Sequence, residues 1–497
     1  SLAGILLGCA SGAREQDATL TVLDPNFEAI FNPSWDMPAK FTLFEPLVGL
    51  DEHGEIEPRL ARRWERSADA RTWTYHLRTD VRWHDGVPVT AHDVAFTMRL
   101  LSHPKILYYG RLDTLIVHDD STLTIRTARP FMGTDWWTVY YPRHLLDTLD
   151  ASRFFEWEFW TRPVGNGPFR YVRHEPRTMW EMEANSDYYR GRPRLDRLVI
   201  KFGGGAPTVE LRSGRVDALT YVGRSEIPAL RADDRFEVHH AIGPDAGWVE
   251  GVIWNHRTVY FADPRVRRAL TMAIDRAELM RMLNLPDGLP IFDVLFTGGQ
   301  FRRRELPPPL PFDPTEAARL LHEAGWSDND ADGVRERDGQ PFRFTALVQS
   351  GGASATSAWD RAAIYIQESL RRVGVRMEIQ TMQAGVLQRL RAGDFEAAVN
   401  RFFQPQAADW FGASSPIGYH APDVTALLAT IRAATAPEAQ DSLMRELMPL
   451  IARDVPLTFF APNVQHFATH RRVRGLSSPY RADPLTHAAY VWLEPRR

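Results

Sequence analysis

From residue 342 to residue 400 the sequence alternates between strand and helix patterns. The expected elements are a strand at 342–348, a helix at 358–372, a strand at 375–381, a helix at 384–391 and a strand at 395–400. Gly374 and Gly393 lie where the two helices should end, because glycine readily adopts the left-handed conformation that closes a helix. Strands that alternate with helices favour an open, doubly wound sheet of parallel strands with helices on both faces. The chain is therefore expected to be an α/β protein.

Two further helices are predicted from their first residues. Thr90 and Asp93 have the spacing of a capping box and precede an apolar periodic run. Asp313 and Glu316 have the same spacing, with proline at the first helical position between them, and Gly325 follows as the expected stop. These signals place one helix in each half of the chain.

Length and charge limit the classes of function. With 497 residues the chain is long enough for about three domains. Its 59 Lys and Arg residues against 63 Asp and Glu residues give a formal charge of -4, so nucleic acid is not an expected partner. Only Lys40, Lys105 and Lys201 are lysines, which disfavours a lysine-dependent phosphate loop or Schiff-base chemistry. No apolar run is long enough to predict a membrane-spanning helix.

The single cysteine, Cys9, ends a short apolar run of small residues. The run Leu6 to Cys9 resembles a bacterial lipoprotein signal, in which Cys9 would be lipidated, and an ordinary free thiol is the alternative. Residues 1–16 are then a signal remnant and linker. Acyl chains would supply the only membrane contact, at about 0.8 kcal/mol per buried methylene. The expected location is the periplasm or the outer face of the bacterial cytoplasmic membrane.

Several blocks of sequence follow one another along nearly the whole chain. The main blocks are 44–48, 56–61, 73–78, 83–94, 165–169, 185–189, 212–217 and 263–270. In residues, order and spacing they resemble family 5 extracellular solute-binding proteins, the peptide, dipeptide and nickel class that serves ABC importers.

The resemblance implies a two-lobe, periplasmic-binding-protein-like clamp with mixed sheets and helices on both faces. Residues 17–48, 165–253 and 463–497 would form a discontinuous lobe I. Residues 49–164 would be an inserted subdomain packed on it, and residues 254–462 would form lobe II. A solute is captured when the lobes close about a hinge, and the permease subunits of the transporter read the closed form.

The candidate ligand residues are those expected to leave strands or helices toward the cleft, where aromatic faces and a few polar groups suit a small molecule. They are Asn32, Trp35, Tyr108, Tyr109, Arg401, Phe402, Phe403, Gln404, Asp409 and Trp410. The alternative for each is an ordinary core or surface role.

One departure from the family pattern bears on the ligand. In peptide binders of this family an acidic residue shortly after a Gly-Trp pair holds the amino group of the peptide. Here the pair falls on Arg401 and Phe402, and the acid falls on Pro405. Asp409 is the alternative counter-charge, whereas Arg401 could instead recognise a carboxylate or phosphate.

The resemblance therefore favours a peptide or peptide-like ligand, with a nickel or other metal complex, or an oligosaccharide, as the alternative. It implies a monomer without catalysis or a cofactor. A secreted hydrolase is the alternative from another class, although the usual catalytic motifs do not occur.

Three further motifs are each open to two interpretations. His84 and Asp85 could form a general base, but the following Gly86 favours a structural turn. His239 and His240 would point to opposite faces of a strand, which disfavours a shared metal.

The third motif, at 328–333, matches the first half of a calcium loop. Asp328, Asp330 and Asp332 have the spacing of the first ligands, but Gly339 replaces the glutamate at position twelve. A solvated loop is therefore favoured over a calcium site.

Overall fold

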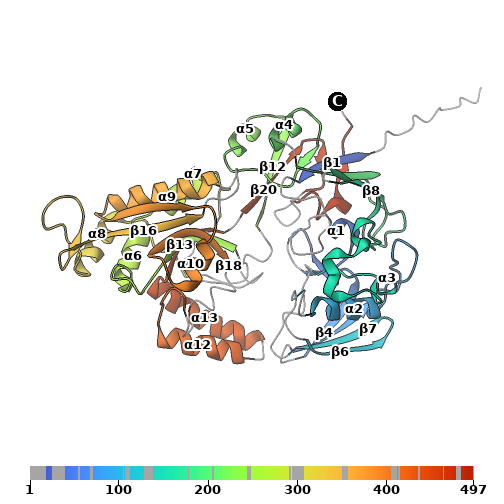
Figure 1. The fold of residues 1–497 in the computed structure, drawn as a ribbon, viewed down its shortest axis with the longest axis horizontal. Helices are drawn as coiled ribbons and strands as arrows, with labels where there is room; N and C mark the ends of the chain where they lie inside the picture. Colours follow the sequence, from blue (N-terminus) through green and yellow to red (C-terminus); the bar gives the residue numbers. More distant parts are fainter. Residues whose placement is uncertain are drawn as a thin grey trace, which may run out of the picture.

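The structure is a computed structural model. It describes residues 18–24, 40–53, 56–67, 71–103, 106, 112–127, 138–176, 178–203, 206–242, 248–289, 291, 293, 307–349, 356–403, 411, 415–434, 437–462, 464–476 and 483–495. Figure 1 shows two lobes that lie side by side and join at one end. Within the described ranges, no helix combines the length and the apolar character that a membrane crossing requires.

The first lobe, which we call lobe I, is built on a seven-stranded mixed sheet. In sheet order its strands are β12 (Phe236–Ile242), β20 (Val464–His470), β11 (Ala218–Leu219), β1 (Thr19–Asp24), β10 (Arg197–Phe202), β9 (Met179–Ala184) and β8 (Phe169–Glu175). β1 pairs in parallel with β10 and β11, and the other pairs are antiparallel. One face packs against Leu211 and Leu230 of two short helices. These helices are α4 (Pro207–Arg212) and α5 (Ile227–Arg231).

A four-stranded antiparallel sheet belongs to the same lobe. Trp73 and Leu123 of this sheet share one continuous core with Leu20 and Leu198 of the seven-stranded sheet. In sheet order its strands are β4 (Ala61–Arg66), β5 (Thr72–Leu77), β7 (Thr122–Thr127) and β6 (Leu112–Asp119). The surrounding elements are α1 (Lys40–Leu43), β2 (Val48–Leu50), β3 (Ile56–Pro58), α2 (Ala91–Leu101), α3 (Arg143–Leu146), η1 (Ala151–Glu156), η2 (Glu158–Thr161), β21 (Val473–Arg474), η4 (Ala488–Tyr490) and β22 (Trp492–Leu493).

The second lobe, lobe II, is built on a five-stranded mixed sheet. In sheet order its strands are β17 (Arg376–Met382), β16 (Arg343–Gln349), β18 (Ala397–Phe403), β13 (Trp248–Trp254) and β19 (Leu457–Pro462). The other elements of the lobe are α6 (Pro264–Met272), α7 (Arg276–Met282), α8 (Pro314–Glu323), β14 (Glu336–Arg337), β15 (Gln340–Pro341), α9 (Thr356–Arg371), α10 (Val386–Ala392), α12 (Pro422–Ala433) and α13 (Pro437–Asp454).

Helices cover both faces of the lobe II sheet, as the alternation of residues along β13 requires. Val252 and Trp254 pack with α6, α7, α8 and α9 on one face. Val249 and Ile253 pack with α10, α12 and α13 on the other. A strand whose side chains are buried on both faces is apolar at nearly every position, which makes Glu250 an exception in this strand.

The elements predicted between residues 342 and 400 are confirmed in type and order, with ends displaced by at most three residues. Gly374 and Gly393 have φ values of 80° and 72°, as predicted for helix ends. The largest difference is in β18, which continues to Phe403 instead of ending at residue 400. The predicted strand ended at Asn400, but β18 lies between two strands and its ladder with β13 continues to Phe403.

The two predicted helix caps have different outcomes. Thr90 and Asp93 form a complete capping box, in which the Thr90 N–H donates to Asp93 Oδ2 over 2.8 Å. The Asp313 side chain accepts a hydrogen bond from the Glu316 N–H over 2.9 Å. The second bond of a capping box, from the Asp313 N–H to the Glu316 carboxylate, was predicted wrongly. The Asp313 N–H donates instead to the carbonyl of Met272, and the Glu316 carboxylate binds a neighbouring arginine.

Candidate ligand site between the two lobes

The chain passes between the lobes at two crossings, 242–248 and 462–464. The carboxyl ends of β1, β10 and β11 lie at the edge of the lobe I sheet where β12 ends and β20 begins. In lobe II, the carboxyl ends of β16, β17 and β18 lie at the edge where β13 begins. Both sheets therefore turn the carboxyl ends of parallel strands toward the crossings, where open α/β sheets bind ligands.

Two predicted ligand segments begin at these edges. The chain leaves β1 at Asp24, before the segment 25–39, and leaves β18 at Phe403, before the segment 404–410. The predicted residues that lie outside the described part of the chain are Cys9, Asn32, Trp35, Tyr108, Tyr109, Gln404, Asp409 and Trp410.

The last three residues of β18 are Arg401, Phe402 and Phe403. They belong to this strand and not to the segment that follows it. The register places Arg401 opposite Glu250 of β13, and it places Phe402 opposite Val249. Directly opposed residues of an antiparallel pair share a face of the sheet. The backbone of Arg401 is therefore paired with that of Glu250 at the edge near the crossings.

The side chain of Glu250 is paired with an arginine of lobe I. Arg224, in the loop after β11, donates from Nη1 to Glu250 Oε2 over 2.9 Å and from Nη2 to Oε1 over 2.5 Å. The two side chains are 10% and 3% exposed, so this ion pair is buried between elements of the two lobes. Burial lowers the pKa of the Arg224 guanidinium, but the charge and hydrogen bonds of Glu250 outweigh it and leave the pKa raised. Glu250 therefore holds the Arg224 guanidinium in its charged form.

The sequence contains one signal for this ion pair, although the pair itself is not among the predicted sites. Glu250 interrupts the otherwise apolar strand from Trp248 to Trp254. A carboxylate in a buried strand is costly unless a cation pairs with it, so this position predicts a partner. The sequence does not identify the partner, because Arg224 is one of many arginines and is separated from Glu250 by 26 residues.

One of two paired histidines of the lobe I sheet lies near Arg224. His466 of β20 is opposite His240 of β12. In addition to burial, the charges of Arg224 and Arg231 both lower the pKa of His466. Burial, followed by the charge of Arg224, lowers the pKa of His466 to about 3, so its ring is neutral at pH 7. Positive surroundings disfavour a bound cation here. The prediction that His239 and His240 do not share a metal is consistent with β12, where His239 bonds Thr469 on the opposite face.

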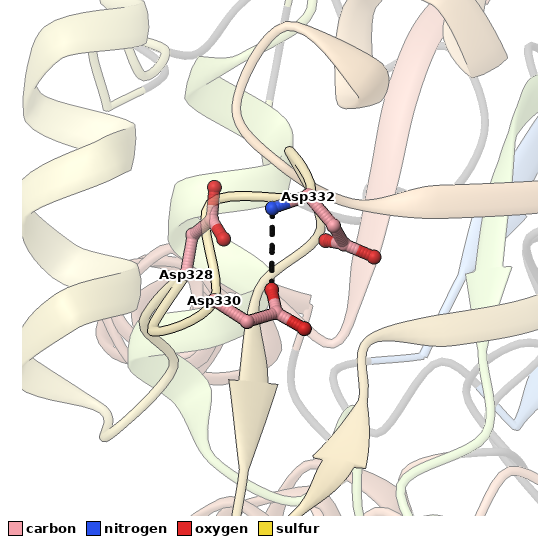
Figure 2. Close-up of side chains that lie close together, drawn as sticks. All are labelled: Asp328, Asp330 and Asp332. Atoms are coloured by element: carbon pink, nitrogen blue, oxygen red, sulfur yellow. Dashed lines mark hydrogen bonds between the residues drawn. The ribbon is translucent and has the colours of Figure 1, made fainter.

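The acidic loop at 328–333 lies in lobe II between α8 and β14. Figure 2 shows that the carboxylates of Asp328, Asp330 and Asp332 lie close together, and all three residues are exposed. The Asp332 N–H donates to Asp330 Oδ1 over 3.2 Å, and the Gly333 N–H donates to Asp328 Oδ2 over 3.1 Å. These bonds are those of a closed turn, and Gly339 supplies no side-chain ligand. Calcium binding at this loop stays a prediction.

The block that contains His84 is structural. The His84 N–H donates to the Gly165 carbonyl over 2.7 Å, and the Gly165 N–H donates to His84 Nδ1 over 3.2 Å. His84 Nε2 lies 3.0 Å from the Gly167 carbonyl. One neutral tautomer satisfies these ring contacts, and burial lowers the pKa of His84 to about 4. Gly86 has a φ of 91° and the Val87 N–H bonds Asp85, so the predicted turn is confirmed.

Two surface cavities offer alternative sites. One, of 610 Å³, lies in lobe I near the start of β12, and two of its arginines pair with carboxylates. Arg190 binds Glu57 over 3.4 Å and Arg474 binds Glu494 over 3.0 Å. The other, of 520 Å³, lies over η1 and η2 on the inserted sheet's side of lobe I. Neither cavity is lined by residues of the edges that face the crossings.

Comparisons with known proteins agree with this architecture. The family model for bacterial extracellular solute-binding proteins, family 5 Middle, matches residues 55–414. A Brucella ovis protein named as an ABC transporter peptide-binding protein is 30% identical over 315 residues. That match covers 60% of this chain and 58% of the relative, less than two thirds of its length. The oligopeptide-binding protein AppA of Bacillus subtilis is 23% identical over 94% of this chain and 90% of AppA.

Solved structures show the same fold. The structure of Bacillus subtilis AppA in complex with a nonapeptide has a TM-score of 0.70 and 21% identity, and the match covers 96% of this chain and 99% of AppA. NikZ of Campylobacter jejuni in complex with Ni(L-His) has a TM-score of 0.73 and 22% identity, over 95% of this chain and 99% of NikZ. With the family match over more than half of its length, the chain belongs to the bacterial extracellular solute-binding proteins of family 5 and has their two-lobe α/β fold.

Proposed function

We propose that the chain captures a small solute between lobes I and II outside the cytoplasmic membrane and delivers it to the permease of an ABC importer. The observation that carries this proposal is the placement of the carboxyl ends of both sheets toward the two crossings. A solute that touches both edges at once favours the closed arrangement, because a ligand shifts a conformational equilibrium only by its difference in affinity for the two states.

The proposed ligand is a peptide or a peptide-like solute. The names of the Brucella ovis and Bacillus subtilis relatives support this class, and AppA is described with a bound nonapeptide. We propose that Trp35, Tyr109, Phe402 and Trp410 supply apolar contacts, while Arg401, Gln404 and Asp409 supply polarity, together with Asn32, Tyr108 and Phe403. In this assignment Asp409 takes the place of the acid missing at Pro405.

A metal complex is the second candidate for the ligand. It is favoured by the likeness to NikZ, whose structure holds Ni(L-His), and by proline at the position of the usual acid. An oligosaccharide is the remaining alternative. Whichever solute is bound, we propose no catalysis and no cofactor, since His84 is engaged with backbone groups of 165–167 and is not available as a base.

The remaining proposals concern organisation and location. We propose that Cys9 carries a lipid that holds a monomer at the outer face of the membrane. Lobe I would comprise 17–48, 165–247 and 463–497, with the insertion at 49–164, and lobe II would comprise 248–462. The border predicted between 253 and 254 moves to before β13, because β13 pairs with β18 and β19 of the lobe II sheet. A bacterial membrane fraction that retains the parent chain but not a Cys9→Ser variant would support the anchor, and equal retention would contradict it.

The ligand is tested by thermal unfolding of the full chain with di-, tri- and nonapeptides, sugars and nickel-histidine complexes. A ligand at a hundred times its Kd should stabilise the chain by about 2.7 kcal/mol. We expect stabilisation by a peptide that is lost in Asp409→Ala and kept in Asp330→Ala, an exposed acid of lobe II. Stabilisation only by nickel-histidine or sugars would contradict the peptide assignment. No stabilisation by any member of the panel would contradict the capture proposal for these classes.

A further inference from the structure

A cluster of three residues joins the lobes beside the two crossings. Arg224 belongs to lobe I, whereas Glu250 lies in β13 and Asn284 follows α7, both in lobe II. The bidentate bonds of Arg224 to Glu250 measure 2.9 and 2.5 Å, and Asn284 Nδ2 donates to the Arg224 carbonyl over 2.9 Å. Lobe II therefore binds both the side chain and the backbone of Arg224 in lobe I. We call these three residues the inter-lobe clasp.

The clasp lies close to both points at which the chain passes between the lobes. Glu250 is the third residue of β13, directly after the first crossing, and it is opposite Ala461 of β19, just before the second. On the lobe I side, the Val222 N–H donates to the carbonyl of His466 over 2.9 Å, which ties the Arg224 loop to the start of β20. The clasp thus adds a third, non-covalent connection to the two covalent ones.

The chemistry of the clasp makes it sensitive to rotation of one lobe against the other. Two parallel N–H···O bonds between a guanidinium and a carboxylate fix an angle as well as a distance. Because both side chains are almost excluded from water, separation would leave two buried charges without partners. Asn284 has a φ of 56°, a conformation that asparagine tolerates better than most residues, and its amide reaches Arg224 from this position. Each lobe therefore contributes a side chain that hydrogen-bonds to the other lobe at this contact.

We propose that the inter-lobe clasp restricts rotation of lobe I against lobe II and so restrains their opening about the crossings. This inference rests on the proposed capture of a solute between the lobes. The clasp sets how much of the free protein is already in a binding-competent arrangement, and so it sets the apparent affinity for the solute.

The test measures the distance between the lobes without any ligand. Spin labels are attached to the full chain in a Cys9→Ser background at Asp113→Cys in β6 and Ala429→Cys in α12, both exposed. These elements lie at the end of the molecule away from β12 and β20 in Figure 1, where opening moves the lobes furthest apart. Pulsed electron double resonance then gives the distribution of distances.

We expect a narrow distribution in the labelled parent chain. The double variant Arg224→Met and Glu250→Met, which leaves no buried charge, should broaden it and add longer distances. The matched control removes Arg276 and Asp293, an ion pair buried within lobe II with both side chains 3% exposed. Replacing both by methionine should leave the distribution of the parent.

An unchanged distribution in the clasp variant, or equal broadening in the control, would overturn the proposal. If the double variant fails to fold, two single variants replace it. Glu250→Gln keeps the side-chain volume, and Asn284→Gly keeps the backbone conformation at positive φ. Each of them must then broaden the distance distribution. No solute is added in this experiment. Failure of the peptide screen would therefore count against the proposed function, and an unchanged distance distribution would count against the clasp.

Discussion

Replacement of Gly165 by alanine should strongly destabilise lobe I. Gly165 lies at the join between the inserted sheet and the seven-stranded sheet, where its backbone passes directly over Leu43. A Cβ atom at this position would lie 1.8 Å from the Leu43 carbonyl oxygen and 2.7 Å from the carbonyl carbon. Both atoms belong to the backbone, so no side-chain rotation can relieve the contact and the two segments must move apart.

The expected cost follows from the contacts at this site. The Leu43 carbonyl accepts hydrogen bonds from the N–H groups of Asn166 over 2.9 Å and Gly167 over 2.8 Å. Loss of each bond costs about 0.5–1.5 kcal/mol. Overpacking of a filled site adds about 1–3 kcal/mol. The free energy of unfolding should therefore fall by about 2–6 kcal/mol.

Urea unfolding followed by circular dichroism measures this change. Gly191→Ala is the matched control, because Gly191 has no atom within 4 Å of the added Cβ but has a φ of +95°. That variant should lose about 1–2 kcal/mol from the left-handed conformation alone. A Gly165→Ala variant no less stable than Gly191→Ala would refute the argument from close packing.

Two other predictions concern buried basic groups. Burial lowers the pKa of His84 from 6.5 to about 4, so the unfolded chain binds more protons in that window. Stability should therefore be fully present above pH 6.5 and fall as the pH drops toward 4, and urea midpoints of His84→Asn should vary less over this window. Arg267, which is 3% exposed, donates to the carbonyls of 261, 262, 454 and 455. Arg267→Met should cost at least about 3 kcal/mol by urea unfolding, whereas Arg265→Met, which removes an exposed pair with Asp263, should cost at most about 1 kcal/mol, and equal losses would contradict this difference.

The local order of elements in lobe II could be predicted because each signal lies within the element itself. Gly374 and Gly393 mark helix ends by a backbone conformation that few other residues adopt, and both have it. The end of β18 could not be predicted in this way. Its last three residues are strand because β13 lies alongside them, and the sequence around Asn400 contains no sign of that neighbour.

The candidate site also has a part that could be predicted from the sequence and a part that could not. The strand order alone brings the carboxyl ends of β1 and β18 to the edges near the crossings, where open α/β sheets bind ligands. The Arg224–Glu250 contact depends on a pairing between two lobes, which local sequence patterns do not encode. Glu250 could have been identified as an unusual acid in a buried strand, but its partner could be identified only from the structure. The side chains proposed to touch the ligand stay predictions.

Capture as proposed requires that lobes I and II close on a solute. The most direct measurement is the distance between labels at Asp113→Cys and Ala429→Cys, in the Cys9→Ser background, before and after addition of each peptide, sugar and nickel-histidine complex of the panel. If the lobes close on a peptide, at least one peptide shortens the distance and narrows its distribution. A distance that stays unchanged with every solute, while thermal unfolding reports binding, would contradict capture by closure of the two lobes.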